Sequence, residues 1–405
     1  MLDKLLIVEL ASVLAGPSVG QFFAELGARV VKIENPATGG DVTRAWYRSG
    51  EDRSRPASYF DACNFGKESV ALDIRTSAGQ GVLRQLVEKA DILLTSFGPG
   101  SAERLGLTPP VFAAWNPRLI QGAVSGYGPS AARPGYDAVI QAESGFMDLN
   151  GDPDGPPVKM PVAFIDLMAA HHLKEAILVQ LLKRRDSGTG AYLEVSLLDA
   201  ALASLANQAT SWMRTGITPR RSGSVHPNIA PYGTVLRTAD QGSVLLAVGN
   251  DRQFQALCRV LGCTHLASDA ELADNAGRVA ERSRLDAGLQ LAAGAWSSKD
   301  LMAALNLERV PAGLIRTVAE ALSDESAGPV LLRSSVSPEA AAPLGTRVGL
   351  GSEPQPRGLR QWLFHPKRAD LSAPPRLGAQ TRLVLAGLTD LAPNDINLLI
   401  PAIPE

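Results

Sequence analysis

Short apolar runs alternate with longer amphipathic stretches along the first half of the chain. Runs of strand length that are rich in apolar or β-branched residues occupy 5–10, 29–33, 70–74, 91–94 and 119–124. Helical spacing of apolar residues appears between some of them, at 21–26 and 78–89. Ala15-Gly16-Pro17 is expected to form the turn after the first strand. Since strands that alternate with helices form parallel sheets through right-handed crossovers, the pattern predicts an α/β fold with a doubly wound, Rossmann-like large domain.

A turn-rich stretch and a long helix follow this alternation. Gly151–Pro157 contains only glycine, aspartate and proline, a composition that favours a turn. A helix is expected from about Leu167, and it should end where three basic residues precede Gly188. A strand at 192–197 and a second helix at 198–213 complete this part of the pattern.

The composition changes near residue 215, where glycine, proline, serine and arginine become frequent. A hairpin pattern at 234–248 and helical patterns at 251–261 and 298–305 come next, and a last helical pattern covers 380–388. Because a single core rarely extends past roughly 250–300 residues, a chain of 405 residues predicts more than one domain. We expect a large domain at 1–214, a smaller α+β domain at 215–325 and a long connecting segment at 326–375. Residues 330–405 are expected to return to the large domain or to a partner subunit.

Charge and cysteine content exclude several classes of protein. The formal net charge is −2 with mixed signs along the chain, which favours neither nucleic acid nor an anionic membrane as a partner. No stretch combines the length and apolarity of a membrane span, and the run at 5–8 is too short for a signal peptide. Three cysteines without a C-x-x-C pair fit reduced thiols, so a cytoplasmic location is expected.

Familiar catalytic and cofactor motifs are missing from the sequence. There is no G-x-G-x-x-G fingerprint, no Walker loop and no G-x-S-x-G nucleophile elbow. His171 and His172 are adjacent, and neighbouring helix positions point about 100° apart, so no metal site is expected. The remaining candidates for chemistry are carboxylates, with no clear leader from the pattern alone.

Asp166 is one of these carboxylates, because it follows the apolar run 162–165 and precedes the strongest helical pattern. An aspartate at a helix start commonly serves as the N-cap, where it accepts hydrogen bonds from free first-turn amides. The same position also suits a nucleophile, since those amides can stabilise a developing oxyanion. The residues alone leave both interpretations open.

A series of short motifs runs through the chain in a fixed order. They are Val13-Leu-Ala-Gly-Pro17, Leu26-Gly-Ala-Arg-Val-Val-Lys-Ile-Glu34, Gly40-Asp-Val-Thr-Arg44, Ser69-Val-Ala-Leu-Asp73, Phe97-Gly-Pro-Gly100, Arg104-Leu-Gly106, Asn116-Pro-Arg-Leu-Ile120, Ser125-Gly-Tyr-Gly128, Gly151–Pro157, Gly188-Thr-Gly190 and Val195-Ser-Leu-Leu198. In this order and spacing the chain resembles the class III CoA-transferases, the family of formyl-CoA transferase and carnitine CoA-transferase. The resemblance runs from residue 5 to about 199, returns at 226–259 and is weak at 377–398.

This resemblance implies a CoA-transferase that moves CoA from an acyl-CoA to a small carboxylic acid. It places the catalytic aspartate at Asp166, with acyl-aspartyl anhydride and aspartyl-CoA thioester intermediates. The positions that match CoA-binding residues are Val13, Ala15, Leu72, Arg75, Phe97 and Arg104. Those expected around the substrate and the oxyanion are Leu14, Tyr136, His226 and Asn228. The resemblance further implies an interlocked homodimer and no metal or cofactor beyond CoA as a co-substrate.

The chain departs from formyl-CoA transferase at three places. Leu14 replaces a glutamine, Asn35 replaces an arginine, and His226-Pro227-Asn228 stands in place of a glycine-run loop. The stretch 226–232 instead resembles relatives that use small dicarboxylates such as succinate, so succinyl-CoA is the expected donor. An arginine-rich stretch could bind a second carboxylate or could be a solvated loop; it contains Arg44, Arg48, Arg53 and Arg55.

Two alternative functions remain open. The α-methylacyl-CoA racemases share the fold and carry a histidine base in a Gly-His-Asp motif, where this chain has Gly135-Tyr136-Asp137. Tyrosine, with a reference pKa of about 10, is a poor base at neutral pH, which favours the transferase. A non-catalytic CoA-binding protein is the second alternative, and it predicts CoA affinity that does not depend on Asp166.

Overall fold

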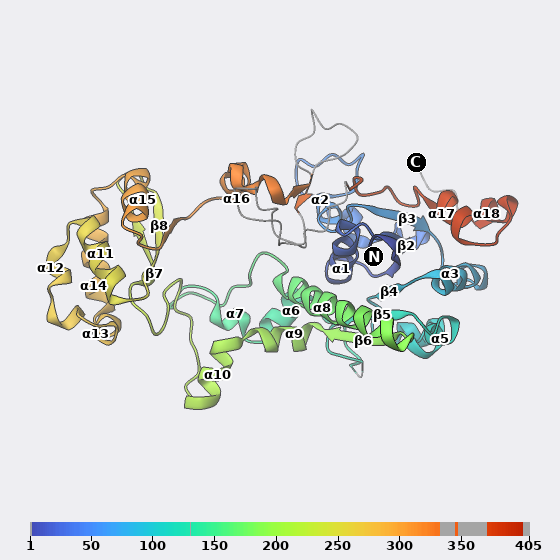
Figure 1. Cartoon of the computed structure of the whole chain (residues 1–405), viewed down its shortest axis with the longest axis horizontal. Helices are drawn as coiled ribbons and strands as arrows, with labels where there is room; N and C mark the ends of the chain where they lie inside the picture. The colour runs from blue at the N-terminus through green and yellow to red at the C-terminus, as the bar shows by residue number, and fades with distance from the viewer. Residues whose placement is uncertain (1, 130, 333–344, 347–370, 400–405) are drawn as a thin grey trace. The chain divides into compact units, whose positions relative to one another are not determined.

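The computed structural model describes residues 2–129, 131–332, 345–346 and 371–399, and its contacts divide the chain into two compact units. The larger unit comprises Met1–Ser144, Met160–Ala209 and Gly328–Glu405. The smaller unit comprises Gly145–Lys159 and Thr210–Ala327 (Figure 1). The domain boundaries expected from the sequence stay a prediction, and most of the expected connection at 326–375 lies outside the described residues.

A six-stranded parallel sheet forms the larger unit, with the strand order β3-β2-β1-β4-β5-β6. The strands are β1 (Leu6–Leu10), β2 (Arg29–Glu34), β3 (Lys67–Ala71), β4 (Ile92–Thr95), β5 (Ile120–Ser125) and β6 (Ala191–Ser196). The strand order reverses between β1 and β4, as it does in doubly wound Rossmann folds. The expected α/β fold class is therefore confirmed, and ligands of such folds bind outside the carboxyl ends of the strands at this reversal.

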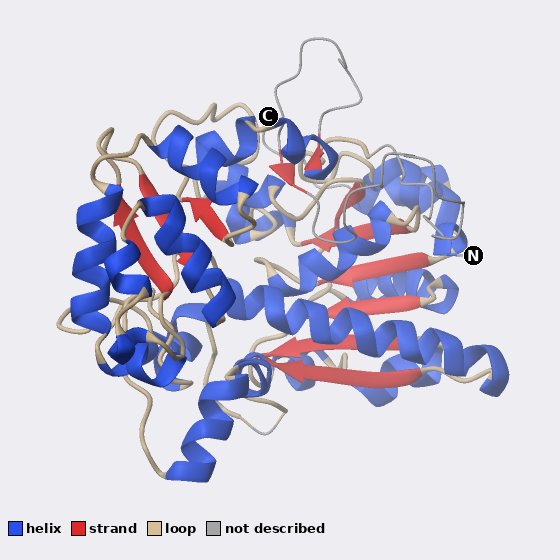
Figure 2. Cartoon of the chain, turned by 60° about the vertical axis from the view of Figure 1, so that its left-hand side comes forward, coloured by secondary structure: helices blue, strands red, loops and turns tan. Residues whose placement is uncertain are grey.

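Helices cover both faces of this sheet (Figure 2). On one face, α1 (Ala15–Glu25) packs against α8 (Phe164–Ser187), and both contact the strands. On the other face, α3 (Ser77–Lys89), α5 (Pro109–Trp115) and α17 (Thr381–Leu388) share a core with Val8, Val31 and Val70. Because side chains alternate between the faces of a strand, Glu9, Lys32 and Lys67 face α1 instead.

The other helices of the larger unit are short. They are α2 (Ser58–Asp61), α4 (Ser101–Leu105), α6 (Asp137–Glu143), α9 (Leu197–Ser204) and α18 (Pro393–Leu399), with 3₁₀ turns at Leu2–Lys4, Pro36–Thr38 and Val42–Ala45. A further 3₁₀ turn, Glu325–Val330, spans a boundary between the two units. Two-residue strands β10 (Leu331–Leu332) and β11 (Gly345–Thr346) pair antiparallel. Helix α10 (Ala206–Thr215) contains the boundary between the two units.

The smaller unit has its own antiparallel sheet and core. Its strands are β7 (Tyr232–Arg237), β8 (Ser243–Ala247) and β9 (Ala312–Leu314). Its helices are α7 (Phe146–Leu149), α11 (Asp251–Leu261), α12 (Thr264–Ala267), α13 (Asn275–Ala280), α14 (Arg282–Ala293), α15 (Ser298–Leu307) and α16 (Val318–Ser323), with a 3₁₀ turn at Ala270–Leu272. Residues of α11, α14 and α15 pack with those of the strands into one apolar cluster. This combination matches the α+β character expected from the sequence.

Three local predictions differ from the structure. Ala15-Gly16-Pro17 is the first turn of α1 and not a loop; proline is tolerated there because first-turn amides have no intrahelical acceptor. The helix expected at 198–213 is interrupted between α9 and α10, where Ala206 has a φ of +46°. Strand β3 begins at Lys67 and not at Val70, because its first residues are polar yet buried.

The outer edge of the sheet, β3, is paired with the C-terminal segment. Ser69 donates its N–H to Gln380 Oε1 (2.9 Å) and accepts the Gln380 N–H (3.1 Å). The Ala71 N–H donates to Thr381 Oγ1 at 2.9 Å, and Figure 1 shows α17 (red) beside β3. These contacts satisfy outward-facing backbone groups that an edge strand would otherwise expose.

Two glycines one helical turn apart let α1 approach the sheet closely. A Cβ at Gly16 would lie 2.4 Å from the Ala11 Cβ, and one at Gly20 would lie 1.9 Å from Glu9 Oε2. Such distances are far below van der Waals contact, so a side chain at Gly16 would force α1 or the residues after β1 to move, and one at Gly20 would displace the Glu9 carboxylate. Gly20 in particular leaves the space that the Glu9 carboxylate occupies.

Gly20→Ala is therefore expected to destabilise the protein by about 1–3 kcal/mol, the usual cost of overpacking a core. A loss of stability is unusual for this substitution, because replacing glycine by alanine within a helix normally stabilises the protein by about 0.5–1 kcal/mol. Gly81→Ala in α3 is the matched control, since a Cβ there meets no atom within 4 Å. Urea unfolding of both variants should give shifts of opposite sign; a stabilised Gly20→Ala would contradict the close approach.

Candidate active site

A cavity of about 620 Å³ lies at the carboxyl ends of the parallel strands in the larger unit. Its wall includes the loops that follow β1, β4 and β5. The strand order reverses between β1 and β4, and β5 is the neighbour of β4. Residues 12–16, 95–100 and 125–129 supply these loops, and Asp137 and Asp166 also line the cavity. The position follows the general rule for ligand sites in open α/β sheets, and the volume is typical of small-molecule pockets.

Asp166 is the third residue of α8 and is 8% exposed. The N-cap position is occupied by Ala163, which makes no side-chain capping bond, so the interpretation of Asp166 as an N-cap is wrong. The helix can begin earlier than expected because the Ile165 N–H donates to Asp137 Oδ1 at 3.3 Å. A distant carboxylate thus caps α8, and the Asp166 carboxylate is left to face the cavity.

The surroundings of Asp166 disfavour its charged form. Burial raises the pKa of Asp166 from its ordinary value of 3.8 to about 7, and repulsion from the nearby Asp137 adds to the rise. Among the described residues, none donates a hydrogen bond to the Asp166 carboxylate, so nothing offsets the loss of water. Asp137 itself accepts two contacts from the Gln141 side-chain amide, at 2.7 and 3.1 Å. A carboxylate this basic in a cavity is a candidate for nucleophilic or acid–base chemistry.

Two aromatic residues near Asp166 were not identified from the sequence. Trp46 lines the cavity and packs edge-on against Tyr59 of α2, with ring centroids 5.0 Å apart. Burial, and then the negative charge of Asp166, raise the pKa of Tyr59 to about 12, so its hydroxyl stays protonated. Neither residue belongs to a motif with chemical meaning, and isolated aromatic residues usually indicate only a core.

The structure brings several of the predicted site residues together. Val13, Leu14, Ala15, Phe97 and Tyr136 line the same cavity as Asp166. Tyr136 is 62% exposed and occupies the motif position of the racemase histidine. These placements agree with the expected cluster, while the role of each residue stays a prediction.

Other predicted CoA-binding residues lie outside this cavity. Leu72 lines a smaller cavity of about 170 Å³ beside the ends of β1 and β2. Arg75 is paired with Asp73 at 2.7 Å, and Arg104 donates to Ser101 Oγ at 2.7 Å. Both arginines are exposed and line neither cavity, so their predicted contacts with phosphate would require these local bonds to be exchanged.

His226 and Asn228 belong to the smaller unit. The Asn228 N–H donates to His226 Nδ1 at 3.1 Å, and the Asn228 carbonyl accepts from the Asn275 side chain at 2.8 Å. The His226 ring packs edge-on against Tyr232 with centroids 5.4 Å apart. These bonds give the loop a defined local geometry, and its expected role at the thioester stays a prediction.

The arginine-rich stretch does not offer all its cations to a substrate. Arg44 is buried and forms a bidentate pair with Glu34, at 2.8 and 2.6 Å, so the proposal that it binds a substrate carboxylate is wrong. Arg55 lies 3.8 Å from Asp61 and remains about half exposed. Arg133, by contrast, lines the cavity, where it stacks 3.8 Å from the Tyr127 ring centroid and pairs with Glu143.

In the part of the chain that the structure describes, no helix is both long and apolar enough to cross a membrane. Nor does that part of the chain contain a group of three or more histidine, cysteine, aspartate or glutamate side chains arranged to hold a metal ion.

Comparison with known proteins decides the family of the chain. The family model described as “CoA-transferase family III” matches residues 2–340. The chain belongs to CoA-transferase family III. As a family III CoA-transferase, the protein is an enzyme, and the motifs described above are motifs of that family.

Proteins named as CoA-transferases resemble the chain over most of its length. A succinate–glutarate CoA-transferase of Agrobacterium fabrum is 39% identical over 330 residues, 80% of this chain and 82% of that protein. An acetyl-CoA:oxalate CoA-transferase of Acetobacter aceti is 36% identical over 82% of this chain and 85% of that protein. The crystal structure of a CaiB/BaiF family protein from Brucella suis superposes with a TM-score of 0.79 at 38% identity, covering 96% of this chain and 99% of that one.

Proposed function

We propose that this CoA-transferase moves CoA from a dicarboxylyl-CoA, with succinyl-CoA as the first candidate, to a carboxylic acid through covalent intermediates on Asp166. The observation that carries the proposal is the Asp166 carboxylate itself, which is buried in the cavity and has a pKa of about 7. Desolvation makes the carboxylate more basic and hence more nucleophilic than an ordinary aspartate, while part of the population is still ionised near neutral pH.

The proposed reaction exchanges acyl bonds in matched steps. An Asp166 oxygen attacks the thioester carbonyl, the C–S bond breaks, and CoA leaves as a thiolate from an acyl-aspartyl anhydride. The thiolate attacks the aspartyl carbonyl of the anhydride, which releases the donor acid as its carboxylate and leaves an aspartyl-CoA thioester. The acceptor carboxylate then runs the same steps in reverse. Because each bond broken is replaced by a similar activated bond, no ATP is consumed, and each barrier is lower than that of direct exchange.

Backbone amides supply candidate donors for the oxyanions of these steps. Ala15 and Gly16 lie in the first turn of α1 and line the cavity, and first-turn amides have no acceptor within their own helix. The positive end of the α1 dipole adds to their effect on a developing negative charge. Donors fixed in place before the reaction stabilise the transition state without reorganising during it.

A dicarboxylic substrate is supported by the relatives and by one cation. The two relatives described above are named for succinate, glutarate and oxalate, all of them dicarboxylic acids. Arg133 brings a guanidinium to the cavity wall, and a guanidinium pairs with a carboxylate through two parallel hydrogen bonds. We propose that Arg133 exchanges its partner Glu143 for the free carboxylate of the substrate.

We also propose that the protein is a homodimer and is located in the cytoplasm. The resemblance to the family implies interlocked subunits, and apolar side chains in and after α10 are more than half exposed at Trp212, Met213 and Ile217. Contiguous exposed apolar residues are typical of surfaces that contact another chain. Light scattering behind size-exclusion chromatography would measure the mass, and a monomer at micromolar concentration would contradict the dimer.

Intact-protein mass spectrometry after incubation with succinyl-CoA tests the covalent mechanism. The wild type is expected to gain the mass of CoA less water, and Asp166→Ala is expected to gain nothing. Asp186→Ala, which removes an exposed carboxylate near the other end of α8, should keep the adduct. A panel of acyl-CoAs that all fail, together with exchange of the α-proton of an α-methylacyl-CoA into solvent, would favour a racemase.

The pH dependence of kcat/KM offers a second measurement on the same carboxylate. Because Asp166 must be ionised to attack, activity should rise with pH through a value near 7. Asp137→Asn removes the repelling charge, so the pKa of Asp166 falls and the rise moves to lower pH. Burial, the larger cause, remains, and the pKa should stay above 3.8. Asp186→Asn is the control, and an unchanged profile in Asp137→Asn would show that Asp137 does not act on Asp166.

A further inference from the structure

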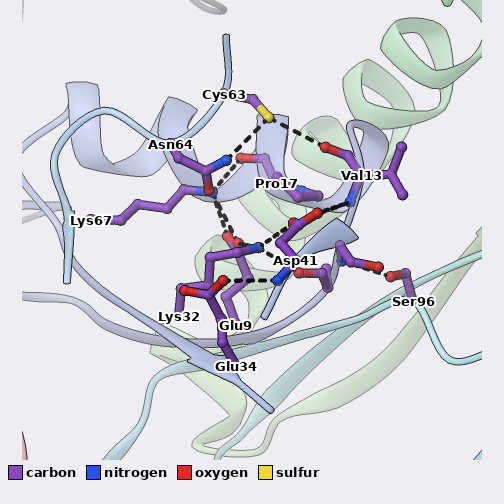
Figure 3. Close-up of polar contacts among 12 residues, drawn as sticks. Glu9, Val13, Pro17, Lys32, Glu34, Asp41, Cys63, Asn64, Lys67 and Ser96 are labelled. Atoms are coloured by element: carbon purple, nitrogen blue, oxygen red, sulfur yellow. Dashed lines mark hydrogen bonds and ion pairs between the residues drawn. The ribbon is translucent and has the colours of Figure 1, made fainter. Parts of the chain in front are cut away.

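Four charged side chains form a buried ionic network beneath the loop that follows β1 (Figure 3). The network consists of Glu9, Lys32, Asp41 and Lys67, which are all at most 4% exposed. Glu9 accepts from Lys32 Nζ at 2.9 Å and from Lys67 Nζ at 2.8 and 2.9 Å. Lys32 Nζ also lies 3.0 Å from Asp41 Oδ2. Two carboxylates and two amino groups are therefore paired with one another inside the fold.

The strand register places these charges side by side. Glu9 of β1 lies directly opposite Lys32 of β2, and Lys67 begins the next strand. Burial alone would lower the pKa of Lys32, but attraction to Glu9, Asp41 and Glu34 outweighs it and raises that pKa. Burial would raise the pKa of Asp41, but Lys32 and the bonds from Thr43 hold it below its usual value. Both groups thus remain charged at neutral pH.

The network forms hydrogen bonds with the backbone of three residues in and beside the loop that follows β1. Lys32 donates to the Ala11 carbonyl at 2.7 Å, and Lys67 donates to the Pro17 carbonyl at 2.9 Å. Between them, Val13 donates its N–H to the two Asp41 oxygens, at 3.3 and 3.2 Å. The buried Cys63 thiol donates to the Val13 carbonyl at 3.5 Å, so both polar atoms of Val13 have partners.

Val13 adopts a conformation that valine avoids. Its φ is +71°, in the left-handed region that suits glycine and strains a β-branched residue. Such strain costs of order 1–3 kcal/mol, and it persists only where the surrounding structure over-determines it. The strained residue and its neighbours Leu14 and Ala15 line the cavity that contains Asp166. Asp41 lies behind this loop and does not line that cavity.

We propose that Asp41 is a positioning residue for CoA transfer, which holds Val13 in its left-handed conformation so that the Val13–Ala15 backbone meets the thioester beside Asp166. The inference rests on the proposed function, because it concerns the same cavity and reaction. Asp41 acts through the Val13 N–H, and the Lys32 ammonium keeps its carboxylate charged and in place. A neutral or missing side chain at this position would let Val13 relax toward the ordinary β region and move the first turn of α1.

A double-mutant cycle tests this role. Asp41→Ala should lower kcat/KM for the acyl-CoA by about 10–100-fold, the scale of loss that a displacement of about 1 Å causes. Adding Val13→Gly should recover about tenfold relative to Asp41→Ala, because glycine adopts the positive φ without the carboxylate. Val13→Gly alone completes the cycle and supplies the reference for the coupling. Where Asp41→Ala does not fold, Asp41→Asn carries the same cycle.

Asp91→Ala is the matched control for a loss of stability alone. Asp91 also holds a backbone N–H, that of Leu6 at 3.0 Å, and pairs with a buried cation, Arg184 at 2.9 Å. It precedes β4, at the end of the sheet away from the cavity, so its loss should lower the unfolding temperature and change kcat/KM less than twofold. Equal kinetic losses in Asp41→Ala and Asp91→Ala, or no recovery with Val13→Gly, would overturn the positioning role.

The results that would contradict the proposed function differ from those that would contradict the role of Asp41. If the wild type transfers CoA and Asp166→Ala does not, the reaction at Asp166 stands whatever the Asp41 cycle gives. If the wild type transfers CoA from no acyl-CoA, or if Asp166→Ala remains active, the proposed mechanism fails and the role of Asp41 falls with it. Coupling between Asp41 and Val13 in an active enzyme supports both.

Discussion

Asp166→Asn is expected to reduce CoA transfer at least about 10³-fold while making the folded protein more stable at alkaline pH. An amide cannot form the anhydride, so the covalent route is closed. The same change removes a charge that the native state accommodates badly, because burial and Asp137 raise the pKa of Asp166 to about 7. A variant that loses activity and gains stability would show that the Asp166 carboxylate serves catalysis at the expense of stability.

The sign of the stability effect follows from the raised pKa. Between the ordinary value of 3.8 and about 7, native Asp166 binds more protons than unfolded Asp166, so the wild type loses stability as the pH rises through that window. The advantage of Asp166→Asn in urea unfolding should therefore grow by about 2–3 kcal/mol from pH 5 to pH 8. Asp186→Asn should show neither effect. A constant difference between the two pH values would contradict the raised pKa.

Glu9→Gln is expected to destabilise the protein by about 3–5 kcal/mol, the cost of breaking a buried ion pair on one side. Glu9 is the carboxylate that contacts Lys67 within the buried ionic network, and Lys67 is 2% exposed. Glutamine has nearly the same shape, so the loss would come from an ammonium group left without its counter-charge in the core. Thermal and urea unfolding at pH 7 would measure it.

Glu68→Gln is the control for this prediction. Glu68 of β3 pairs with Arg29 of β2 at 2.7 Å, but the two side chains are 24% and 40% exposed. Exposed pairs contribute about 0–1 kcal/mol, so the same substitution at Glu68 should have little effect. Equal losses in the two variants would mean that the network adds no more than a surface ion pair does.

The parallel sheet could be predicted from the sequence because most residues of its strands are apolar and form short continuous runs. β1, β4 and β5 appear within one residue of the expected runs, and α11 matches its predicted range. β3 was misplaced, because Lys67 and Ser69 look like exposed strand residues although both are buried. Periodicity measures apolarity, and it cannot show that a lysine is buried against a carboxylate of another strand.

Residues of the candidate site could be predicted only where a family motif contains or locates them. The motifs located Asp166 and the loop at 13–15, which the structure places at one cavity. They did not reveal Asp137 as the carboxylate that caps α8 and shifts the Asp166 pKa, since the two are 29 positions apart in the chain. Lys32 and Asp41 belong to the family motifs, but the motifs do not show that they are in contact. The Lys32–Asp41 ion pair and the bond from Val13 to Asp41 depend on the folded arrangement of the strands.

The bonds between β3 and the C-terminal segment set an order of events during synthesis. The Ala71 amide and the Thr381 hydroxyl that it contacts are 310 positions apart. At roughly 5–20 residues per second, the ribosome needs roughly 15–60 s to add that length. For this interval the nascent sheet presents an open edge on which a neighbouring chain could add a strand. A segment made late in synthesis therefore covers a strand edge made early, and until then that edge is open to pairing with a neighbouring chain.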